Sequence, residues 1–429
     1  MRLFDLRANP DLVIPRPDPG PEPVEIVRGI IEKVRTEKDR ALRELTERLD
    51  GVRLEGLRVE PEEIEQAAAL VSSDLMEALR EAAGRIRAVA GRQSLRPWRA
   101  EVGGGTVGEC VHPLSRAGIY VPGGRAAYPS TVLMCAVPAA VAGVPSVALT
   151  TPPAPDGRVP AATLAAAHVA GVNEVYLVGG AQAIAALAFG TESVERADVI
   201  VGPGNIYVAL AKREVSGFVQ IDSVAGPSEI AIVTDGGADP LVLAADLIAQ
   251  AEHGPHGSFL LVTWEPELVP AVETGLASAL AELAAPEGLR ASLEEGAAAV
   301  LVSDLDQALE AVNRFAPEHV ELIFQGAESA VERVRGAGAI FVGPWSPVSL
   351  GDYLAGTSHV LPTGGAAAWS SPLRTSHFQK TSTFAIFDRS SLEVALPPVR
   401  ALARAEGLPN HARALEARLL KDEAKGTPR

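Results

Sequence analysis

Cysteine is scarce in this chain of 429 residues, which contains only Cys110 and Cys135 and no CxxC pair. Two isolated cysteines argue against a disulfide framework and are too few for a thiolate metal site. Basic side chains are also outnumbered, with 38 against 54 acidic ones, which leaves a formal charge of −16. Because such a charge repels phosphate backbones, the composition argues against a nucleic-acid partner.

Long uncharged apolar runs are nearly absent as well. The one candidate, Val132–Leu149, is long enough to span a bilayer but is interrupted by Pro138, Gly143 and Pro145. It is better interpreted as a buried helix that ends near Gly143, followed by a strand at 146–150. The first residues lack the continuous apolar segment of a signal peptide. The sequence therefore predicts a cytoplasmic protein with no membrane partner.

Short apolar strands alternate with alanine-rich helices from Gly118 onwards. This alternation is typical of βαβ units, in which helices cover a parallel sheet. Upstream, apolar residues recur at helical spacing from Val24 to about Arg92. We therefore predict an α/β fold with two Rossmann-like, non-standard parallel-sheet lobes, a helical N-terminal region and a helical C-terminal appendage.

The predicted domain division has four parts. Residues 1–22 form a proline-rich N-terminal arm, and 23–117 together with 229–373 form a discontinuous first α/β domain with a helical N-terminal part. Residues 118–228 form a second α/β domain, and 374–429 form a helical tail without a core of its own. Two α/β lobes in one chain favour a ligand held between them.

Glycine-rich turns follow several of the predicted strands. Gly123-Gly124 and the GPGN segment at 202–205 each stand between a strand and a helix, where backbone N–H groups can approach a phosphate. The segment 179–182, GGAQ, lies between them in the chain. The G-x-G-x-x-G fingerprint is missing, so an ordinary Rossmann site is not expected and a purely structural turn is the alternative for each. Together the turns favour a dinucleotide site in 118–228.

Gln250 and His253 lie three residues apart at the end of a predicted helix and so share one face of it. At that spacing an amide oxygen and an imidazole can converge on one metal ion. Without thiolates, the ligands are N and O donors, which suit zinc and also manganese or cobalt. Asp352, His359 and His411 are further candidate donors. The alternative is that these are ordinary surface or core residues, as most lone helical histidines are.

The segment Pro317-Glu318-His319 sets a carboxyl group beside an imidazole. Histidine titrates near neutral pH and is suited to take a proton from an alcohol, while the neighbouring glutamate can orient a water molecule. Consecutive residues of a regular strand point to opposite faces, so both can act in one site only if the backbone turns there. A solvent-facing helix-to-strand connection is the alternative, and on this pattern alone it is favoured.

Eight segments of the chain form a pattern when they are taken together: PLSRAGIYVPGGRAAYPSTVLM, GGAQAIAALAFGTESV, VGPGNIYVALAKREV, IDSVAGPSEI, AADLIAQAEH, FAPEHVEL, GDYLAGTSHVLPTGG and EGLPNH. In their order and spacing, these segments resemble the histidinol dehydrogenase family. The resemblance runs over nearly the whole chain. It implies two NAD-dependent oxidations, from L-histidinol through L-histidinaldehyde to L-histidine, at the end of histidine biosynthesis.

The resemblance also implies roles for individual residues. It implies a zinc ion that mainly holds the substrate, bound by Gln250, His253, Asp352 and His411. The implied acid/base pair is Glu318 and His319, and the implied NAD contacts are Tyr120, Gln182 and Asn205. The implied substrate contacts are Ser228, His319, His359 and Glu406, beside the four metal ligands. The family is a homodimer in which the C-terminal segment crosses over, so Glu406 and His411 are expected to complete the partner's site.

Three positions depart from the family pattern. Val199 stands where the family often has Lys, Ser358 stands where it favours Asn, and 367–373 lacks an Arg and a Gly of the usual segment. None of these removes an acid/base or metal residue, but they bear on cofactor affinity and on the loop after His359. The main alternative is a paralogue that oxidises a different small amino or sulfo alcohol with NAD. A non-catalytic dinucleotide-binding scaffold and a zinc hydrolase are further alternatives.

Overall fold

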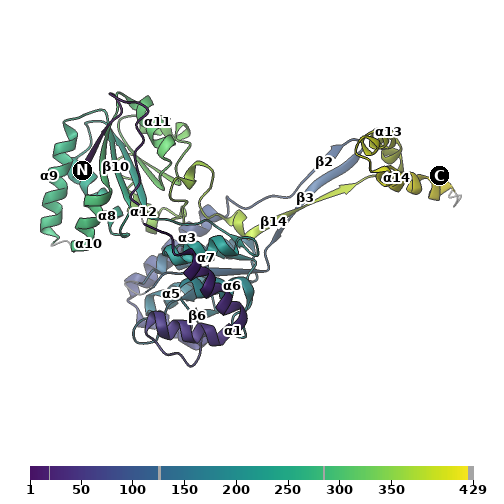
Figure 1. The fold of residues 1–429 in the computed structure, drawn as a ribbon, viewed down its shortest axis with the longest axis horizontal. Helices are drawn as coiled ribbons and strands as arrows, with labels where there is room; N and C mark the ends of the chain where they lie inside the picture. Colours follow the sequence, from purple (N-terminus) through teal and green to yellow (C-terminus); the bar gives the residue numbers. More distant parts are fainter. Residues whose placement is uncertain (19, 124–126, 284–285, 424–429) are drawn as a thin grey trace. The chain divides into compact units, whose positions relative to one another are not determined.

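The computed structural model describes residues 1–18, 20–123, 127–283 and 286–423. Its contacts divide the chain into two compact units, Met1–Ser94 with Leu114–Phe378, and Leu95–Pro113 with Gln379–Arg429. The first unit contains two parallel sheets, and the second contains an antiparallel sheet and two helices (Figure 1). The predicted α/β fold with two parallel-sheet lobes and helical regions toward both ends is confirmed.

A five-stranded parallel sheet has the strand order β6-β5-β4-β7-β8. Its strands are β4 Arg116–Tyr120, β5 Ser146–Thr151, β6 Val175–Leu177, β7 Val199–Val201 and β8 Gln220–Ile221. The helices between them are α4 Pro129–Ala142, α5 Ala161–Ala170, α6 Gly180–Phe189 and α7 Ile206–Val215. The strand order reverses between β4 and β7, so the carboxyl ends of these two strands lie at a topological switch point.

The uncharged stretch Val132–Leu149 forms most of α4 and part of β5, as the sequence predicts. Gly143 ends α4 in the left-handed conformation, with a φ of 86°, and its N–H bonds to carbonyls of the last turn. Both elements are buried because they form the centre of this lobe. Within the described parts of the chain, no helix is long and apolar enough to cross a membrane.

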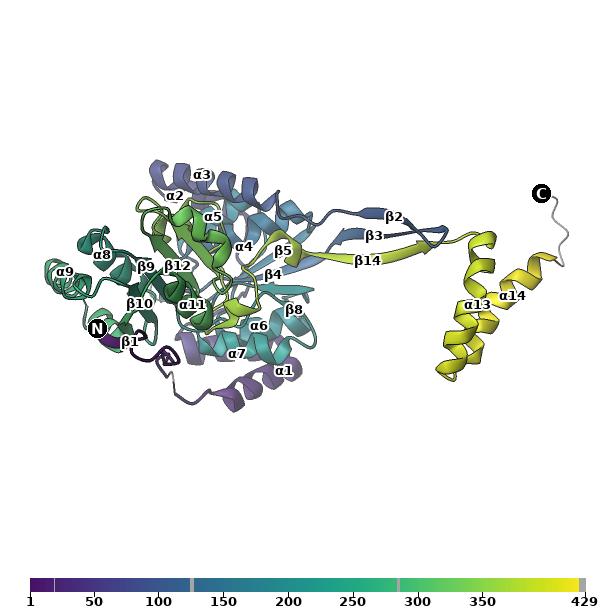
Figure 2. The same cartoon turned by 90° about the horizontal axis from the view of Figure 1, so that it is seen from above.

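The helices α1 Val24–Asp50, α2 Pro61–Leu70 and α3 Ser73–Ala90 pack against the helices that cover the five-stranded sheet. α1 joins α6 and α7 over one apolar face, and α2 and α3 join α4 and α5 over the other (Figure 2). This packing differs from the predicted division, which grouped 23–117 with 229–373. Helical periodicity shows which face of a helix is buried but not which sheet it is buried against.

A six-stranded parallel sheet has the order β1-β11-β10-β9-β12-β13. Its strands are β1 Arg2–Asp5, β9 Glu229–Thr234, β10 Ser258–Thr263, β11 Ala297–Leu301, β12 His319–Ile323 and β13 Ala339–Val342. Helices α8 Pro240–Ala251, α9 Leu268–Glu282, α10 Glu287–Gly296 and α12 Val348–Tyr353 line one face, and α11 Leu305–Phe315 lines the other. The start of the predicted arm is therefore an edge strand, because β1 pairs with β11.

The second unit is built on the antiparallel sheet β14-β3-β2. Its elements are β2 Trp98–Val102, β3 Gly105–Pro113, β14 Gln379–Ile386, α13 Arg389–Ala405 and α14 Pro409–Glu423. The predicted tail helices are confirmed, but the prediction of a helical tail over 374–429 missed β14. That strand is mostly polar and exposed and pairs with a strand far away in sequence, so no local apolar pattern indicates it.

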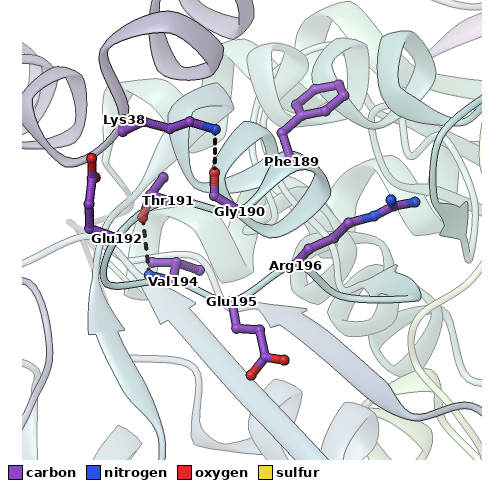
Figure 3. Close-up of a pocket in the computed structure, with 8 residues that line it drawn as sticks. All are labelled: Lys38, Phe189, Gly190, Thr191, Glu192, Val194, Glu195 and Arg196. Atoms are coloured by element: carbon purple, nitrogen blue, oxygen red, sulfur yellow. Dashed lines mark hydrogen bonds between the residues drawn. The ribbon is translucent and has the colours of Figure 1, made fainter.

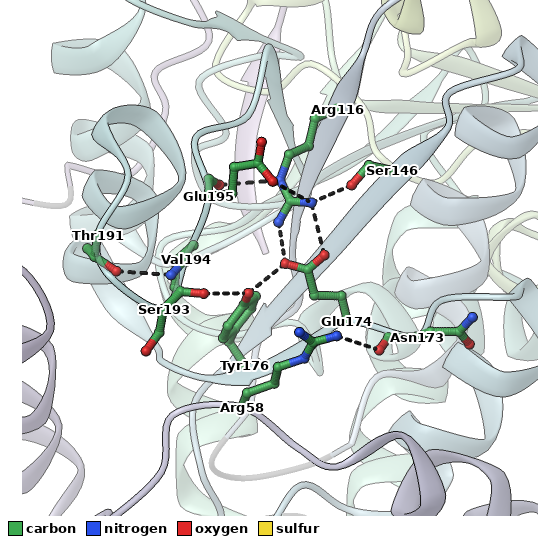
Figure 4. Close-up of polar contacts among 10 residues, drawn as sticks. All are labelled: Arg58, Arg116, Ser146, Asn173, Glu174, Tyr176, Thr191, Ser193, Val194 and Glu195. Atoms are coloured by element: carbon green, nitrogen blue, oxygen red, sulfur yellow. Dashed lines mark hydrogen bonds and ion pairs between the residues drawn. The ribbon is translucent and has the colours of Figure 1, made fainter.

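A buried polar cluster joins the amino-terminal ends of three strands of the five-stranded sheet (Figure 4). The Arg116 guanidinium donates to Glu174, with Nη1 2.9 Å from Oε2, and also to Ser146. The Tyr176 hydroxyl donates to Glu174 at 2.5 Å and approaches the Ser193 carbonyl at 2.7 Å. Because these groups satisfy one another, the cluster is a structural brace at the edge of the sheet opposite Tyr120.

A buried carboxyl pair on the six-stranded sheet gives the stability of the protein a pH dependence. Glu321 on β12 accepts a hydrogen bond from the α12 backbone N–H of Val348 at 2.9 Å, and its carboxyl group also lies against the Asp246 carboxyl on α8. Burial, with a smaller contribution from the Asp246 charge, raises the pKa of Glu321 to about 8. Burial likewise raises the pKa of Asp246 to about 6.

Both carboxyl groups have a higher pKa in the folded state than in the unfolded chain, so folding favours their protonated forms. The stabilisation they provide is therefore complete below about pH 4 and is lost as the pH rises through about 8. We expect Glu321→Gln to unfold with a weaker pH dependence between pH 5 and 9, and to be more stable than the parent by roughly 1–3 kcal/mol at the alkaline end. Urea unfolding at several pH values measures the free energy of unfolding, with the exposed Glu328→Gln as the control. The same dependence of this free energy on pH in both variants would contradict the prediction.

Candidate active site

The three predicted cofactor contacts lie at the carboxyl edge of the five-stranded sheet. Tyr120 is the last residue of β4, Gln182 is in the first turn of α6, and Asn205 is the N-cap of α7 after β7. The Tyr120 hydroxyl accepts a hydrogen bond from the Gly180 N–H at 3.2 Å. Gln182 is buried, and its Oε1 atom has no hydrogen-bond partner within the described residues. A polar atom left unpaired in this way is a candidate donor or acceptor for a ligand.

Asn205 also has a structural role, because its side-chain oxygen accepts from the N–H groups of Tyr207 and Val208 at 3.1 and 3.2 Å. This N-cap explains the residue without any cofactor. Of the first predicted glycine turn, Gly124 lies outside the described residues. A Cβ on Gly123 would lie 2.8 Å from Pro152, and one on Gly202 would lie 2.0 Å from the Tyr120 carbonyl oxygen. Only glycine fits at Gly202, where φ is 118°.

An ion pair that the sequence analysis did not identify holds the turn at Gly202. Lys212 of α7 is fully buried beside Asp222, and its ammonium donates to the Gly202 carbonyl at 3.0 Å. Asp222 accepts from the Gly202 N–H at 2.8 Å. The pair therefore fixes both polar groups of one peptide at the switch point. The available sequence signal was the position of Lys212, which lies at helical spacing from Val208 and Val215 and so on the apolar face of α7. A lysine is almost never buried there without a partner.

Glu318 and His319 lie at the amino end of β12, and the backbone turns there as the shared-site prediction requires. Ala316 ends α11 in the left-handed conformation with a φ of 51°, and the strand begins at His319. The side chains converge, with His319 Nδ1 3.6 Å from Glu318 Oε2. The Glu229 carbonyl lies 3.0 Å from the same Nδ1 atom. Because a carbonyl only accepts, this contact assigns the proton to Nδ1 and leaves the lone pair on Nε2.

Burial sets the protonation of this pair. Together with the nearby His253 and His359, it lowers the pKa of His319 to about 3, so the imidazole is neutral at pH 7. Burial also raises the pKa of Glu318 to about 8, although hydrogen bonds from the Glu229 N–H and the Ser228 hydroxyl act against the rise. The pair therefore combines a neutral imidazole with a carboxyl group that ionises only toward alkaline pH.

Three of the four predicted metal ligands come from α8, the turn after it, and the neighbouring α12. His253 Nε2 lies 4.0 Å from Asp352 Oδ2. Gln250 is buried in the last turn of α8, and its Nε2 atom has no hydrogen-bond partner in the described chain. Among residues 1–18, 20–123, 127–283 and 286–423, no three His, Cys, Asp or Glu side chains are grouped closely enough for a metal. The amide of Gln250 is a further possible ligand, beside these four residue types.

The predicted substrate contacts are divided between the two units. Ser228 precedes β9 and bonds to Glu318, and His359 Nδ1 lies 2.9 Å from the Asp352 carbonyl. His359 Nε2 is 3.3 Å from the Thr131 hydroxyl of α4. Glu406 and His411 are exposed and belong to the second unit, at the end of α13 and the start of α14. Within the first unit alone, the predicted metal site therefore lacks one ligand.

A surface depression of about 410 Å³ contains none of the predicted site residues (Figure 3). It lies at the end of α6, where Lys38 donates to the Gly190 carbonyl at 3.0 Å. Lys38 has a φ of 55° at a kink in α1, so its side chain caps the end of α6 at a cost in backbone strain. This contact accounts for Lys38 structurally, and the depression adds nothing to the candidate site.

The fold is α/β with two parallel sheets, and its site sets a buried, neutral imidazole beside a carboxyl group. These features place the protein in the class of α/β enzymes. Residues 20–419 match the family model described as histidinol dehydrogenase. The histidinol dehydrogenase of Moorella thermoacetica is 50% identical over 395 residues, which cover 91% of this chain and 93% of that protein. The one from Geobacillus kaustophilus is 47% identical over 398 residues, which cover 92% and 94%.

A solved structure gives the same result. The crystal structure of histidinol dehydrogenase from Elizabethkingia anophelis matches with a TM-score of 0.93 and 34% identity, covering 99% of each chain. The chain therefore belongs to the histidinol dehydrogenase family, which is a family of oxidoreductases. The resemblance inferred from the eight segments is confirmed at the level of the family.

Proposed function

We propose that this protein is a cytoplasmic, homodimeric enzyme that uses zinc and NAD to oxidise L-histidinol through L-histidinaldehyde to L-histidine. One L-histidinol, one water and two NAD+ give one L-histidine, two NADH and the released protons. The observation that carries the proposal is the convergence of Glu318 and His319 at the start of β12, with the imidazole held neutral. The family membership supplies the substrate class.

In the proposed mechanism, His319 acts twice as the base. The Glu229 carbonyl holds the Nδ1–H, so Nε2 is available to take the hydroxyl proton of the alcohol. NAD, when bound, would accept the hydride that leaves the carbon carrying this hydroxyl group. Glu318 accepts a proton from the water that adds to the aldehyde, which it can do only as the carboxylate. Protonated His319 gives its proton to the aldehyde oxygen as the water adds, and the neutral imidazole then takes a hydroxyl proton of the resulting hydrate in the second oxidation.

The residues present fit a zinc ion. Gln250 has an unpaired, buried amide that a metal would satisfy once the amide is oriented with its oxygen outward, and His253 and Asp352 face each other at a distance that a shared ion could bridge. Zinc bound by Gln250, His253, Asp352 and His411 would hold the amino group and imidazole of the substrate. Manganese or cobalt suits the same nitrogen and oxygen donors.

Tyr120, Gln182 and Asn205 are proposed to contact NAD. All three stand at the carboxyl edge of one sheet beside its switch point, the usual position for a nucleotide in an open α/β sheet. The unpaired Gln182 Oε1 supports this proposal. The same edge carries the glycine turn at Gly202, which the Lys212–Asp222 pair holds in place.

The homodimer is proposed because the second unit cannot bury its own apolar side chains. Among its described residues, the only buried apolar side chains are Ala403 and Ala412. Several of its large apolar residues are exposed, among them Trp98, Val102, Ile386, Phe387, Val394, Leu402, Leu408 and Leu420. A second copy of the chain would cover them, and Glu406 and His411 would then complete the partner's site.

The stoichiometry of NADH tests the proposed reaction. We expect two NADH per L-histidinol consumed, complete loss of activity after treatment with a chelator, and recovery when zinc is added back. The measurement is absorbance of NADH against substrate remaining, with untreated enzyme passed through the same dialysis as the control. Activity that survives complete removal of metal would contradict the zinc proposal.

The alternatives give different outcomes in the same assay. A paralogue acting on a different small amino or sulfo alcohol would consume no L-histidinol, or would stop at one NADH per substrate. A zinc hydrolase or a non-catalytic scaffold would form no NADH with any alcohol. Two NADH per L-histidinol excludes all three, because only a four-electron oxidation of that substrate yields it.

A further inference from the structure

The backbone of Glu229 holds both members of the proposed acid/base pair. Glu229 is the first residue of β9, next to β12 in the sheet. Its N–H donates to Glu318 Oε2 at 3.0 Å, and its carbonyl accepts from His319 Nδ1 at 3.0 Å. One peptide unit on each side of Glu229 therefore sets the position of the Glu318 carboxyl and the tautomer of the His319 imidazole.

The side chain of Glu229 is in turn held by the N-terminal segment. Arg16 donates to Glu229 Oε1 through Nε and to the Phe315 carbonyl through Nη2. The guanidinium carbon of Arg16 also lies 4.0 Å from the centre of the Phe315 ring. Arg16 stands between Pro15 and Pro17, and Pro17 restricts the Arg16 backbone, so less backbone freedom is lost when this segment docks.

The other carboxylate oxygen of Glu229 reaches the loop that carries a proposed substrate contact. Glu229 Oε2 accepts from the Gly364 N–H at 3.2 Å, in the segment that follows His359. The Glu229 side chain is 3% exposed, so its charge has no solvent to stabilise it and depends on Arg16 and on this N–H. The Arg16–Glu229 pair thus connects the N-terminal segment, the end of α11, the loop after His359 and the acid/base pair.

We propose that Arg16 and Glu229 are positioning residues for catalysis: the Arg16–Glu229 ion pair fixes the start of β9, and β9 fixes Glu318 and His319. This inference rests on the proposed acid/base roles of those two residues. Neither Arg16 nor the Glu229 side chain needs to touch the substrate. Their effect is on the geometry of the reacting groups, where small displacements cost large factors in rate.

The test compares variants of Arg16 by steady-state kinetics and thermal unfolding. We expect Arg16→Met to lower kcat about 10- to 100-fold while the KM values for L-histidinol and NAD stay within about twofold. Arg16→Lys is expected to recover part of kcat, because an ammonium keeps the charge but not the fork that reaches both acceptors. Arg7→Met is the matched control, since Arg7 lies in the same segment and its guanidinium donates to the exposed Asp5 carboxylate.

A double variant separates positioning from stability. Arg16→Met leaves the Glu229 carboxylate buried without its partner, and Glu229→Gln removes that charge while keeping an oxygen for the Gly364 N–H. We expect the double variant to regain most of the lost melting temperature but not the lost kcat. The inference is overturned if kcat recovers together with the melting temperature, or if Arg16→Met turns over like Arg7→Met. Failure of the acid/base proposal is distinct, because His319→Asn would then stay active.

Discussion

Replacing His319 by Asn is expected to abolish alcohol oxidation while leaving the protein folded and its metal bound. Asn can keep a hydrogen bond to the Glu229 carbonyl through its amide N–H groups, so the start of β12 is preserved. It has no titratable nitrogen, so the proton of the substrate hydroxyl has no acceptor. We expect kcat to fall by about 10²–10⁴-fold, the typical contribution of a general base.

The measurement is the rate of NADH formation, alongside zinc content and thermal unfolding of the purified variant. Exposed His168 on α5 provides the matched control, and His168→Asn is expected to retain parental kcat. Turnover of His319→Asn near the parental rate, with zinc retained, would remove His319 from the mechanism. A loss of zinc together with activity would assign His319 to the metal site and not to proton transfer.

Two inactive variants are expected to restore activity to each other when their chains are combined. His319 lies in the first unit and His411 in the second. If the second unit completes the partner's site, a dimer of one His319→Asn chain and one His411→Asn chain has one site with both changes and one site with neither. Random pairing makes half of the dimers mixed, so co-expression should yield about a quarter of the parental activity.

Recovery of activity depends on whether the second unit of one chain completes the site of the partner chain. If His411 served its own chain, every site in the mixed dimer would carry one change, and the mixture would remain as inactive as its components. The matched control combines His319→Asn with Glu318→Gln, two changes in the same unit, for which no recovery is expected in either case. Zinc content adds an independent readout, because His411→Asn alone should retain less zinc on dialysis, and unchanged zinc would exclude it as a ligand.

Much of the fold is determined locally. The helix predicted at PSTVLMCAVPAAVA is α4, Pro129–Ala142, and the strand predicted at 146–150 is β5. Such segments can be predicted from the sequence because strands buried on both faces are apolar throughout and because glycines such as Gly143 end the helices. β14 could not be predicted in this way, since its partner β3 lies far away in sequence, and β14 is largely exposed while β3 is mostly only partly buried.

The candidate site shows the same division. The sequence by itself determined the family and the residue types available for chemistry, because eight segments in fixed order carry them. Only the tertiary structure decided that Glu318 and His319 converge, that burial holds the imidazole neutral, and that Arg16 and Glu229 support the pair. These side chains acquire their positions, their burial and their hydrogen-bond partners only when β9, β12 and the N-terminal segment pack together. No local sequence pattern encodes contacts between segments so far apart.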